Sequence, residues 1–347
     1  MTEESEAHVT PPELNKSVLF TPHSIALITM WLLTTVSLVV MLSGRVRISG
    51  QLRLERYILQ VAYVLALIWY LARSGPSISQ LPKIPPFVFP RWKYGPWVGV
   101  LGLIIILALT AISDDGLLIL ILLSIIATVW ILLVWRREIK LHSVIQALAV
   151  ALFAYLGSLP LLNGFFSENM FYLLLILVAP MYIAGGLLVT RTGLGGVQLW
   201  AKRYRHVLRS FLLGCLLFVP LGLFNAAGGS PGSDITWMNE LWMPFWLGKF
   251  PAITEETWFR LLLIGISYIF LRPAFPTRPA LPILGAVLFS GITFGLLHDR
   301  TLEGFLTTGL LYGLPMAVAF ARRDWEHAVG AHYMINMIPW LMVFLNT

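Results

Sequence analysis

Residues 251–271 read PAITEETWFRLLLIGISYIFL, an apolar run that carries two adjacent glutamates and an arginine. The run is long enough to cross a bilayer as one helix, since about 20 apolar residues span the hydrocarbon core. A charged side chain at the middle of such a helix costs about 2.5–3.5 kcal/mol on insertion scales. Glu255, Glu256 and Arg260 therefore require a structural or chemical reason to be there.

The composition of the whole chain is that of an integral membrane protein. Of its 347 residues, 58% are apolar and 12% are charged, whereas soluble domains carry about 25% charged residues. The chain predicts an all-α polytopic fold with about 10–11 transmembrane helices, because its apolar runs are too long and uniform for barrel strands. These runs are 24–43, 57–72, 97–112, 116–135, 143–162, 170–190, 210–225, 251–271, 281–298, 303–320 and 328–345.

The net charge of +7 does not indicate a nucleic-acid partner, because Lys and Arg cluster in short loops between the apolar runs. Such loops favour the cytoplasmic side of the membrane. Residues 45–56 and 73–93 are both basic although one run separates them, so one of the first two runs need not cross fully. The orientation of the N-terminus therefore stays open. The basic loops that fit one orientation are 136–140, 191–209, 272–278 and 322–323.

Four further features bear on the fold. Cys215 is the only cysteine, which excludes an intrachain disulfide and a cysteine-based zinc site. Residues 1–23 lack the basic start of a signal peptide, so we expect the first apolar run to be retained as a helix. The 191–209 stretch mixes basic and aromatic residues and predicts an interfacial helix. The tryptophan-rich 226–250 stretch predicts an aromatic membrane anchor, with a gate beside the polar site as the alternative.

The spacing of the first polar motif separates its charged groups. Residues four apart share a face of an α-helix, so Glu256 and Arg260 are predicted to form a structural ion pair. Glu255 points about 100° away on the same helix and has no helical partner of opposite charge. A carboxylate placed in this way suits a general base that activates water.

Two more polar motifs follow in the last third of the chain. His298 ends the run 281–298, while His332 and Asn336 lie four apart in the last run. An imidazole and an amide on one helical face could stabilise an oxyanion, and His298 could hold water or shuttle a proton. Taken singly, each motif is also compatible with a helix cap or with polar contacts between membrane helices. Their order and concentration favour a catalytic site.

A zinc site is the alternative use of the same groups. Glu255, His298 and His332 could supply three ligands and leave an open position for water. The chain has no His-Glu-x-x-His motif, and Glu256 would then be the candidate base. We take catalysis without a cofactor as the first hypothesis and zinc as the second.

The three motifs resemble those of the CPBP family, which includes the CAAX prenyl endopeptidases and bacteriocin-processing intramembrane proteases. That family carries EExxxR, FxxxH and HxxxN or HxxxD, which read here as residues 255–260, 294–298 and 332–336. All three are complete and in the family's order, although Leu261 stands where many relatives have glycine. The resemblance covers about residues 210–347.

The resemblance implies a CPBP protease domain at 210–347, preceded by a variable transmembrane region at 24–209 and a polar tail at 1–23. It further implies an intramembrane endopeptidase that hydrolyses a peptide bond of a membrane-associated protein or peptide, in a prokaryotic plasma membrane. The expected partners are that substrate and the lipid bilayer.

The same resemblance implies roles for four residues: Glu255 and His298 would activate water, while His332 and Asn336 would serve the oxyanion. The ion pair of Glu256 and Arg260, predicted from their spacing, would support the site. A non-catalytic membrane adapter or bacteriocin self-immunity protein is the alternative. A proton-coupled transporter ranks last, because it predicts inverted repeats that the sequence does not show.

Overall fold

The computed structural model describes residues 21–42, 50–74, 95–113, 115–158, 168–228, 240–298, 301–302 and 305–346. Within these residues the chain forms helices and no β-strand, which confirms the predicted all-α class. Eight of the described helices are long and apolar enough to cross a membrane. The main helices are α1 (Pro22–Leu42), α2 (Gly50–Ser74), α3 (Gly95–Ile112), α4 (Gly116–Val134), α5 (Leu141–Ser158), α6 (Glu168–Thr192), α7 (Tyr204–Gly228), α8 (Trp242–Leu247), α9 (Lys249–Glu255), η5 (Glu256–Ile264), α10 (Gly265–Leu271), α11 (Ala280–His298), η7 (Phe305–Gly313), α13 (Leu314–Arg322) and α14 (Trp325–Asn346).

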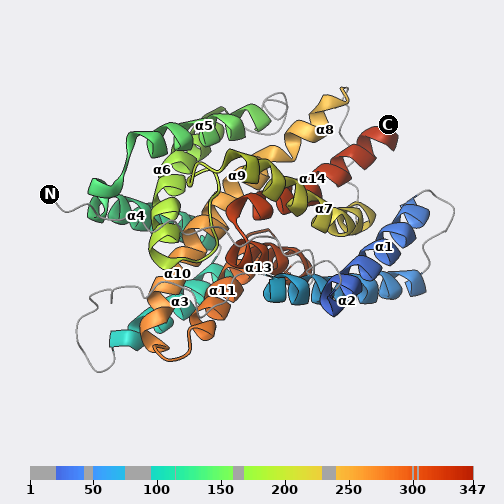
Figure 1. The fold of residues 1–347 in the computed structure, drawn as a ribbon, viewed down its shortest axis with the longest axis horizontal. Helices are drawn as coiled ribbons and strands as arrows, with labels where there is room; N and C mark the ends of the chain where they lie inside the picture. Colours follow the sequence, from blue (N-terminus) through green and yellow to red (C-terminus); the bar gives the residue numbers. More distant parts are fainter. Residues whose placement is uncertain are drawn as a thin grey trace.

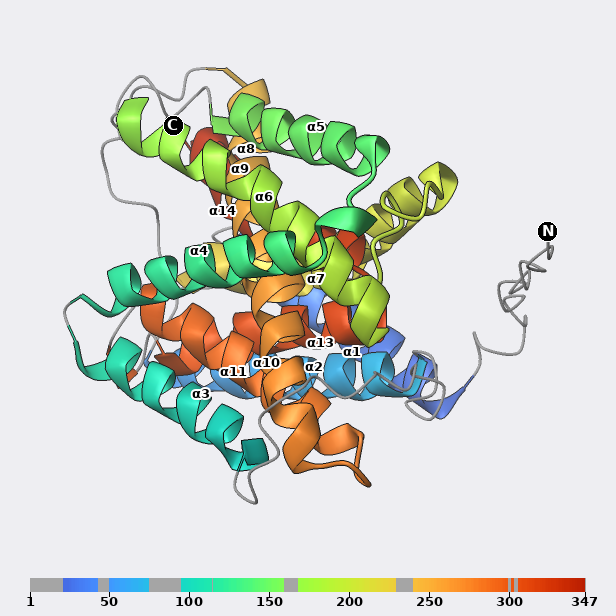
Figure 2. The ribbon, with the colours of Figure 1, turned by 90° about the vertical axis from the view of Figure 1, so that its left-hand side faces the viewer.

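The helices that carry the polar motifs lie between two outer groups of helices. Figure 1 shows α1 and α2 on one side, where they pack against α7 and α13, and α4, α5 and α6 on the other. Figure 2 shows α4, α5 and α6 from that second side, lying across η5, α9 and α10. The helices that precede residue 193 therefore lie on both sides of the segment that contains Glu255 and Glu256.

The predicted apolar runs coincide with helices, with different boundaries in places. α2 begins at Gly50 rather than at 57, and α1 and α2 both qualify as membrane spans by length and composition. The run 251–271 is divided among α9, η5 and α10. Residues 1–20 of the predicted tail and residues 159–162 of the fifth run lie outside the described part of the chain.

The closest helix pair is α7 with α14, and glycine makes this approach possible. A Cβ atom at Gly214 of α7 would lie 2.2 Å from the backbone oxygen of His327 in α14. A Cβ atom at Gly330 of α14 would lie 2.1 Å from the backbone oxygen of Phe211 in α7. Small residues let membrane helices pack backbone to backbone. This contact fixes α14, the helix that carries His332.

A second close contact holds the end of α11 that carries His298. A Cβ atom at Gly295 would lie only 2.6 Å from the Cα atom of Gly309 in η7. Both helices also have a glycine four residues away on this face, Gly291 in α11 and Gly313 in η7. η7 is a π-helix, and the glycines at this contact let it lie directly on α11.

The interfacial helix predicted for 191–209 is wrong in its central part. α6 ends at Thr192 and α7 begins at Tyr204, with turns and irregular backbone between them. Gly193 and Gly195 have φ values of 65° and 64°, a region in which glycine is favoured and a helix ends. The carboxylate of Glu326 then accepts hydrogen bonds from the backbone N–H groups of 198 and 199, at 3.0 and 2.8 Å.

Candidate active site

The first polar motif lies where the geometry of its helix changes. Only Gly248 separates α8 from α9, and its φ and ψ of −63° and −25° are helical. The helical path to the motif therefore begins at Trp242, before the start of the apolar run at 251. At Glu256 the α-helix gives way to the π-helix η5. Such π-helical turns occur frequently at functional sites.

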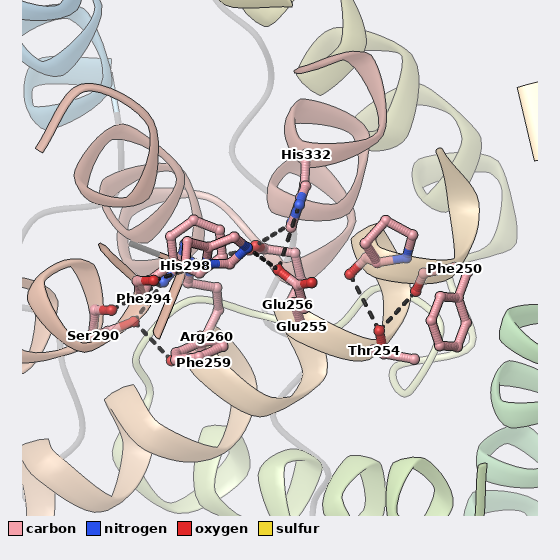
Figure 3. A network of polar contacts seen from close by, with 11 residues as sticks. Phe250, Thr254, Glu255, Glu256, Phe259, Arg260, Ser290, Phe294, His298 and His332 are labelled. Carbon is pink, nitrogen blue, oxygen red and sulfur yellow. Dashed lines mark hydrogen bonds and ion pairs between the residues drawn. The ribbon is translucent and has the colours of Figure 1, made fainter. Parts of the chain in front are cut away.

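Glu256 is fully buried, and each of its two carboxylate oxygens contacts a different side chain. Oε2 lies 3.1 Å from Nε of Arg260, the predicted pair one turn along. Oε1 lies 2.9 Å from Nδ1 of His332 on α14. The spacing of the motif predicted the first contact and gave no indication of the second. Glu256 therefore neutralises Arg260 and also orients a histidine (Figure 3).

Glu255 lies between the two motif histidines. Its Oε2 atom is 3.4 Å from Nε2 of His298 and 3.7 Å from Nε2 of His332. Both separations exceed those of direct N–H···O hydrogen bonds, and this buried oxygen has no hydrogen-bond partner among the described residues. The side chains of Glu255 and His298 are 27% and 38% exposed, whereas His332 is 4% exposed. The group thus has an open side at Glu255 and His298 and a buried side at His332.

Each histidine is held by the nitrogen that faces away from Glu255. Nδ1 of His298 lies 2.8 Å from the backbone oxygen of Phe294. A carbonyl oxygen can only accept, so Nδ1 carries the proton of this contact. Nδ1 of His332 faces the Glu256 carboxylate in the same way. The two Nε2 atoms therefore converge on the Glu255 carboxylate from different helices.

Phe294 packs at the centre of the group. Its ring centroid is 4.3 Å from that of His298 and 5.6 Å from that of His332. The guanidinium carbon of Arg260 lies 4.8 Å from the same ring centroid, within the range of a cation–π contact. The aromatic residue of the second motif thus separates the buried cation from the two imidazoles.

Comparison with known proteins identifies the segment that contains these groups. The family model of the Rce1-like type II CAAX prenyl endopeptidases matches residues 237–338. This segment is similar to the Rce1-like domains. The match includes all three polar motifs and supports the assignment to the CPBP family, which is a family of proteases. Neither the curated proteins nor the solved structures contain a match to the chain.

The matched segment contains one polar residue at the site that the sequence analysis missed. Ser290 of α11 is fully buried, and its hydroxyl oxygen lies 2.7 Å from Nη1 of Arg260 and 2.8 Å from the backbone oxygen of Phe259. Ser290, Phe294 and His298 recur at every fourth position of α11 and so share one face. That spacing is the signal that could have found Ser290.

Asn336 lies one helical turn beyond His332 on α14 and is half-buried. The contacts that join Glu255, Glu256, His298 and His332 to one another do not involve it. Its neighbour Ile335 accepts a hydrogen bond of 3.0 Å from the side-chain amide of Asn225 on α7. Asn336 therefore shares a helical face with His332, as the sequence predicts.

The zinc alternative depends on how the possible ligands are arranged. Among the described residues, no group of three or more His, Cys, Asp and Glu side chains has the arrangement of a metal site. We therefore derive no step through a metal ion for Glu255, His298 and His332. Zinc dependence stays a prediction that a chelator can test.

His327 belongs to a separate buried cluster at the start of α14. Its Nδ1 atom lies 2.7 Å from Oδ1 of Asp324, and the hydroxyl of Ser210 donates to Oδ2 of Asp324 at 2.8 Å. Burial would raise the pKa of Asp324, but the hydrogen bonds and charge of His327, together with Ser210, hold that pKa below its ordinary value. This cluster anchors α14 and takes no part in the arrangement around Glu255.

Proposed function

We propose that the protein is an intramembrane endopeptidase in which Glu255 and His298 activate a water molecule. The observation that carries the proposal is the approach of two imidazole Nε2 atoms, at 3.4 and 3.7 Å, to one oxygen of the half-buried Glu255 side chain. The three side chains come from α9, α11 and α14. The similarity of the matched segment to a protease family supports the same reaction.

In the proposed reaction, Glu255 takes a proton from water, and the resulting hydroxide attacks the carbonyl carbon of the scissile peptide bond. The carbonyl π electrons move to oxygen and form a tetrahedral oxyanion. Collapse of this intermediate breaks the C–N bond, and the proton held by Glu255 passes to the leaving amine, directly or through Nε2 of His298. The products are a new carboxylate and a new amine.

His332 and Asn336 are the proposed donors to the oxyanion. Because Nδ1 of His332 faces Glu256, donation from Nε2 requires a proton on both ring nitrogens. Glu256 supplies the carboxylate against which such a ring is held, and Arg260 balances the charge of that carboxylate. Asn336 can donate through its amide without any change of charge.

The proposed substrate is a peptide or protein tethered to the membrane. A site set among membrane helices favours a chain that is already concentrated at the bilayer. The four proposed catalytic residues would act on the peptide bond in the same way whether or not the substrate carries a prenyl group.

The experiment reconstitutes the purified protein in lipid vesicles with a panel of fluorogenic membrane-anchored peptides, each in a prenylated and an unprenylated form. Wild-type protein should cleave at least one member, and Glu255→Gln and His298→Ala should reduce cleavage at least about 100-fold, in line with loss of a general base. His206→Ala, at an exposed position on α7, is the matched histidine control.

The same vesicles are then treated with a zinc chelator. Full activity would support catalysis by Glu255 and His298 without a metal, whereas loss of activity that added zinc restores would support the zinc alternative. Cleavage by both variants at the wild-type rate would overturn the proposed mechanism. A biological phenotype that survives both substitutions would instead support the adapter or self-immunity function.

A further inference from the structure

We propose that Ser290 is a positioning residue of this site, which acts through Arg260 and Glu256 to fix the ring of His332. The inference deepens the proposed function and rests on it for its catalytic consequence. The contacts themselves involve η5, α11 and α14 and do not include Glu255 or His298.

The direction of the hydrogen bonds at Ser290 is determined by its partners. Its single hydroxyl proton must go to the backbone oxygen of Phe259 at 2.8 Å, because a carbonyl can only accept. The lone pairs of the same oxygen then face Nη1 of Arg260 at 2.7 Å, which can only donate. Ser290 is 0% exposed, so the loss of either contact leaves a buried polar group without a partner and costs free energy.

Arg260 transmits this constraint because its guanidinium group is planar and rigid. With Nη1 fixed on Ser290, Nε lies 3.1 Å from Oε2 of Glu256. The ring of Phe294 covers the guanidinium at 4.8 Å and limits its rotation out of this plane. The second Glu256 oxygen is then left to face Nδ1 of His332 at 2.9 Å.

The order of contacts predicts what the loss of the hydroxyl would do. Without Ser290 Oγ, Nη1 of Arg260 and the Phe259 carbonyl lose a buried partner. Arg260 can then turn away from Glu256 to find another acceptor, and His332 loses the fixed carboxylate that orients it. Because Ser290 does not face the open side of the site, turnover should fall while substrate affinity stays the same.

The chain offers a matched control on the same helix. Thr293 is as fully buried as Ser290, but its hydroxyl lies 2.8 and 3.2 Å from backbone oxygens of its own helix, those of Phe289 and Ser290. Thr293→Val removes this hydroxyl at nearly constant shape. Ser290→Ala is the test variant, and Ser290→Thr restores the hydroxyl with one added methyl group.

Two measurements are made on each variant in lipid vesicles or nanodiscs. The first is kcat and KM on whichever membrane-anchored peptide the wild-type protein cleaves. The second is the ¹⁵N and ¹H NMR signal of the His332 Nδ1–H group, assigned through His332→Gln. If Ser290→Ala does not fold, Ser290→Cys, which keeps a weaker donor and acceptor, takes its place.

We expect Ser290→Ala to lower kcat about 10- to 100-fold, because misplacement of a catalytic group by about 1 Å can cost about 100-fold, with KM unchanged. The His332 signal should shift or broaden in Ser290→Ala and stay unchanged in Thr293→Val, and Ser290→Thr should restore most of both properties. Equal losses in Ser290→Ala and Thr293→Val would overturn the inference, as would an unchanged His332 signal in Ser290→Ala. If the wild-type protein cleaves no peptide, the proposed function fails, and the NMR comparison alone still decides whether Ser290 positions His332.

Discussion

Removal of the charge of Arg260 should reveal a strong energetic coupling with Glu256. Both side chains are 0% exposed, and their closest polar atoms lie 3.1 Å apart. Arg260→Met keeps a long apolar side chain beside the rings of Phe259 and Phe294. It leaves Glu256 as a buried carboxylate whose only remaining contact among these groups is His332.

The size of the expected loss in the free energy of unfolding follows from the burial of both side chains. Removing one partner of a buried ion pair costs about 3–5 kcal/mol, because the remaining charge is left unpaired, whereas replacing both partners is often nearly neutral. Arg260→Met should therefore lower the free energy of unfolding by about 3–5 kcal/mol. The double variant Glu256→Gln, Arg260→Met should lose at least about 2 kcal/mol less than the sum of the single losses, within the range of coupling between contacting residues. The amide oxygen that replaces the Glu256 carboxylate in that variant can still accept from Nδ1 of His332.

The assay is reversible unfolding in mixed detergent micelles of the wild-type protein, the single variants Glu256→Gln and Arg260→Met, and the double variant. Together these four proteins form a complete double-mutant cycle. Thr293→Val serves as a control for loss of a buried polar group outside the pair. Losses that add to within about 0.5 kcal/mol, as for independent sites, would refute the view that Glu256 and Arg260 stabilise each other in the folded protein.

Three further outcomes are expected. Gly295→Ala should lower the free energy of unfolding by about 1–3 kcal/mol and should lower activity as well, because its Cβ would lie 2.6 Å from the Cα of Gly309. A wild-type melting temperature in this variant would contradict the contact. Phe294→Leu should lower kcat about tenfold with a smaller loss of stability, since the ring packs on His298 at 4.3 Å, and unchanged kinetics would count against that role. The pKa of Asp324 lies below its ordinary value in the folded protein, so its contribution to stability is present above about pH 4 and is lost as pH falls through the lowered pKa. Asp324→Asn should remove this part of the pH dependence of unfolding, and an identical acid limb in the variant would contradict it.

The sequence was sufficient for the helical class and for most helix positions, because apolar runs bounded by charge or glycine have few other structures available in lipid. It also predicted the pairing of Glu256 with Arg260, which depends only on a separation of four residues along one helix. Contacts within one helix can be predicted in this way because the backbone alone fixes them.

Contacts between helices were harder to predict. The bond between His332 and Glu256 depends on how α14 packs against η5, and no periodicity within either helix contains that information. Ser290 was missed because a serine in an apolar run is common; its four-residue spacing from Phe294 and His298 places it on their face of α11, but its partners lie on another helix. The change to π-helical geometry at Glu256 is likewise invisible in the residue pattern.

The irregular 193–203 segment illustrates a third limit. Its basic and aromatic residues resemble those of an interfacial helix, yet two glycines with positive φ and the Glu326 carboxylate hold it as a loop. Glu326 lies more than a hundred positions away in the sequence, so composition alone could not reveal a carboxylate that competes for these backbone N–H groups.

The measurement that tests the central claim most directly is cleavage of a membrane-anchored peptide in H₂¹⁸O, followed by mass spectrometry of the fragments. If water activated by Glu255 attacks the peptide carbonyl, the wild-type protein should place one oxygen-18 atom in the new terminal carboxylate, and Glu255→Gln should yield almost no labelled fragment. Labelled fragment formed by Glu255→Gln at the wild-type rate, or wild-type cleavage without any incorporated label, would contradict it.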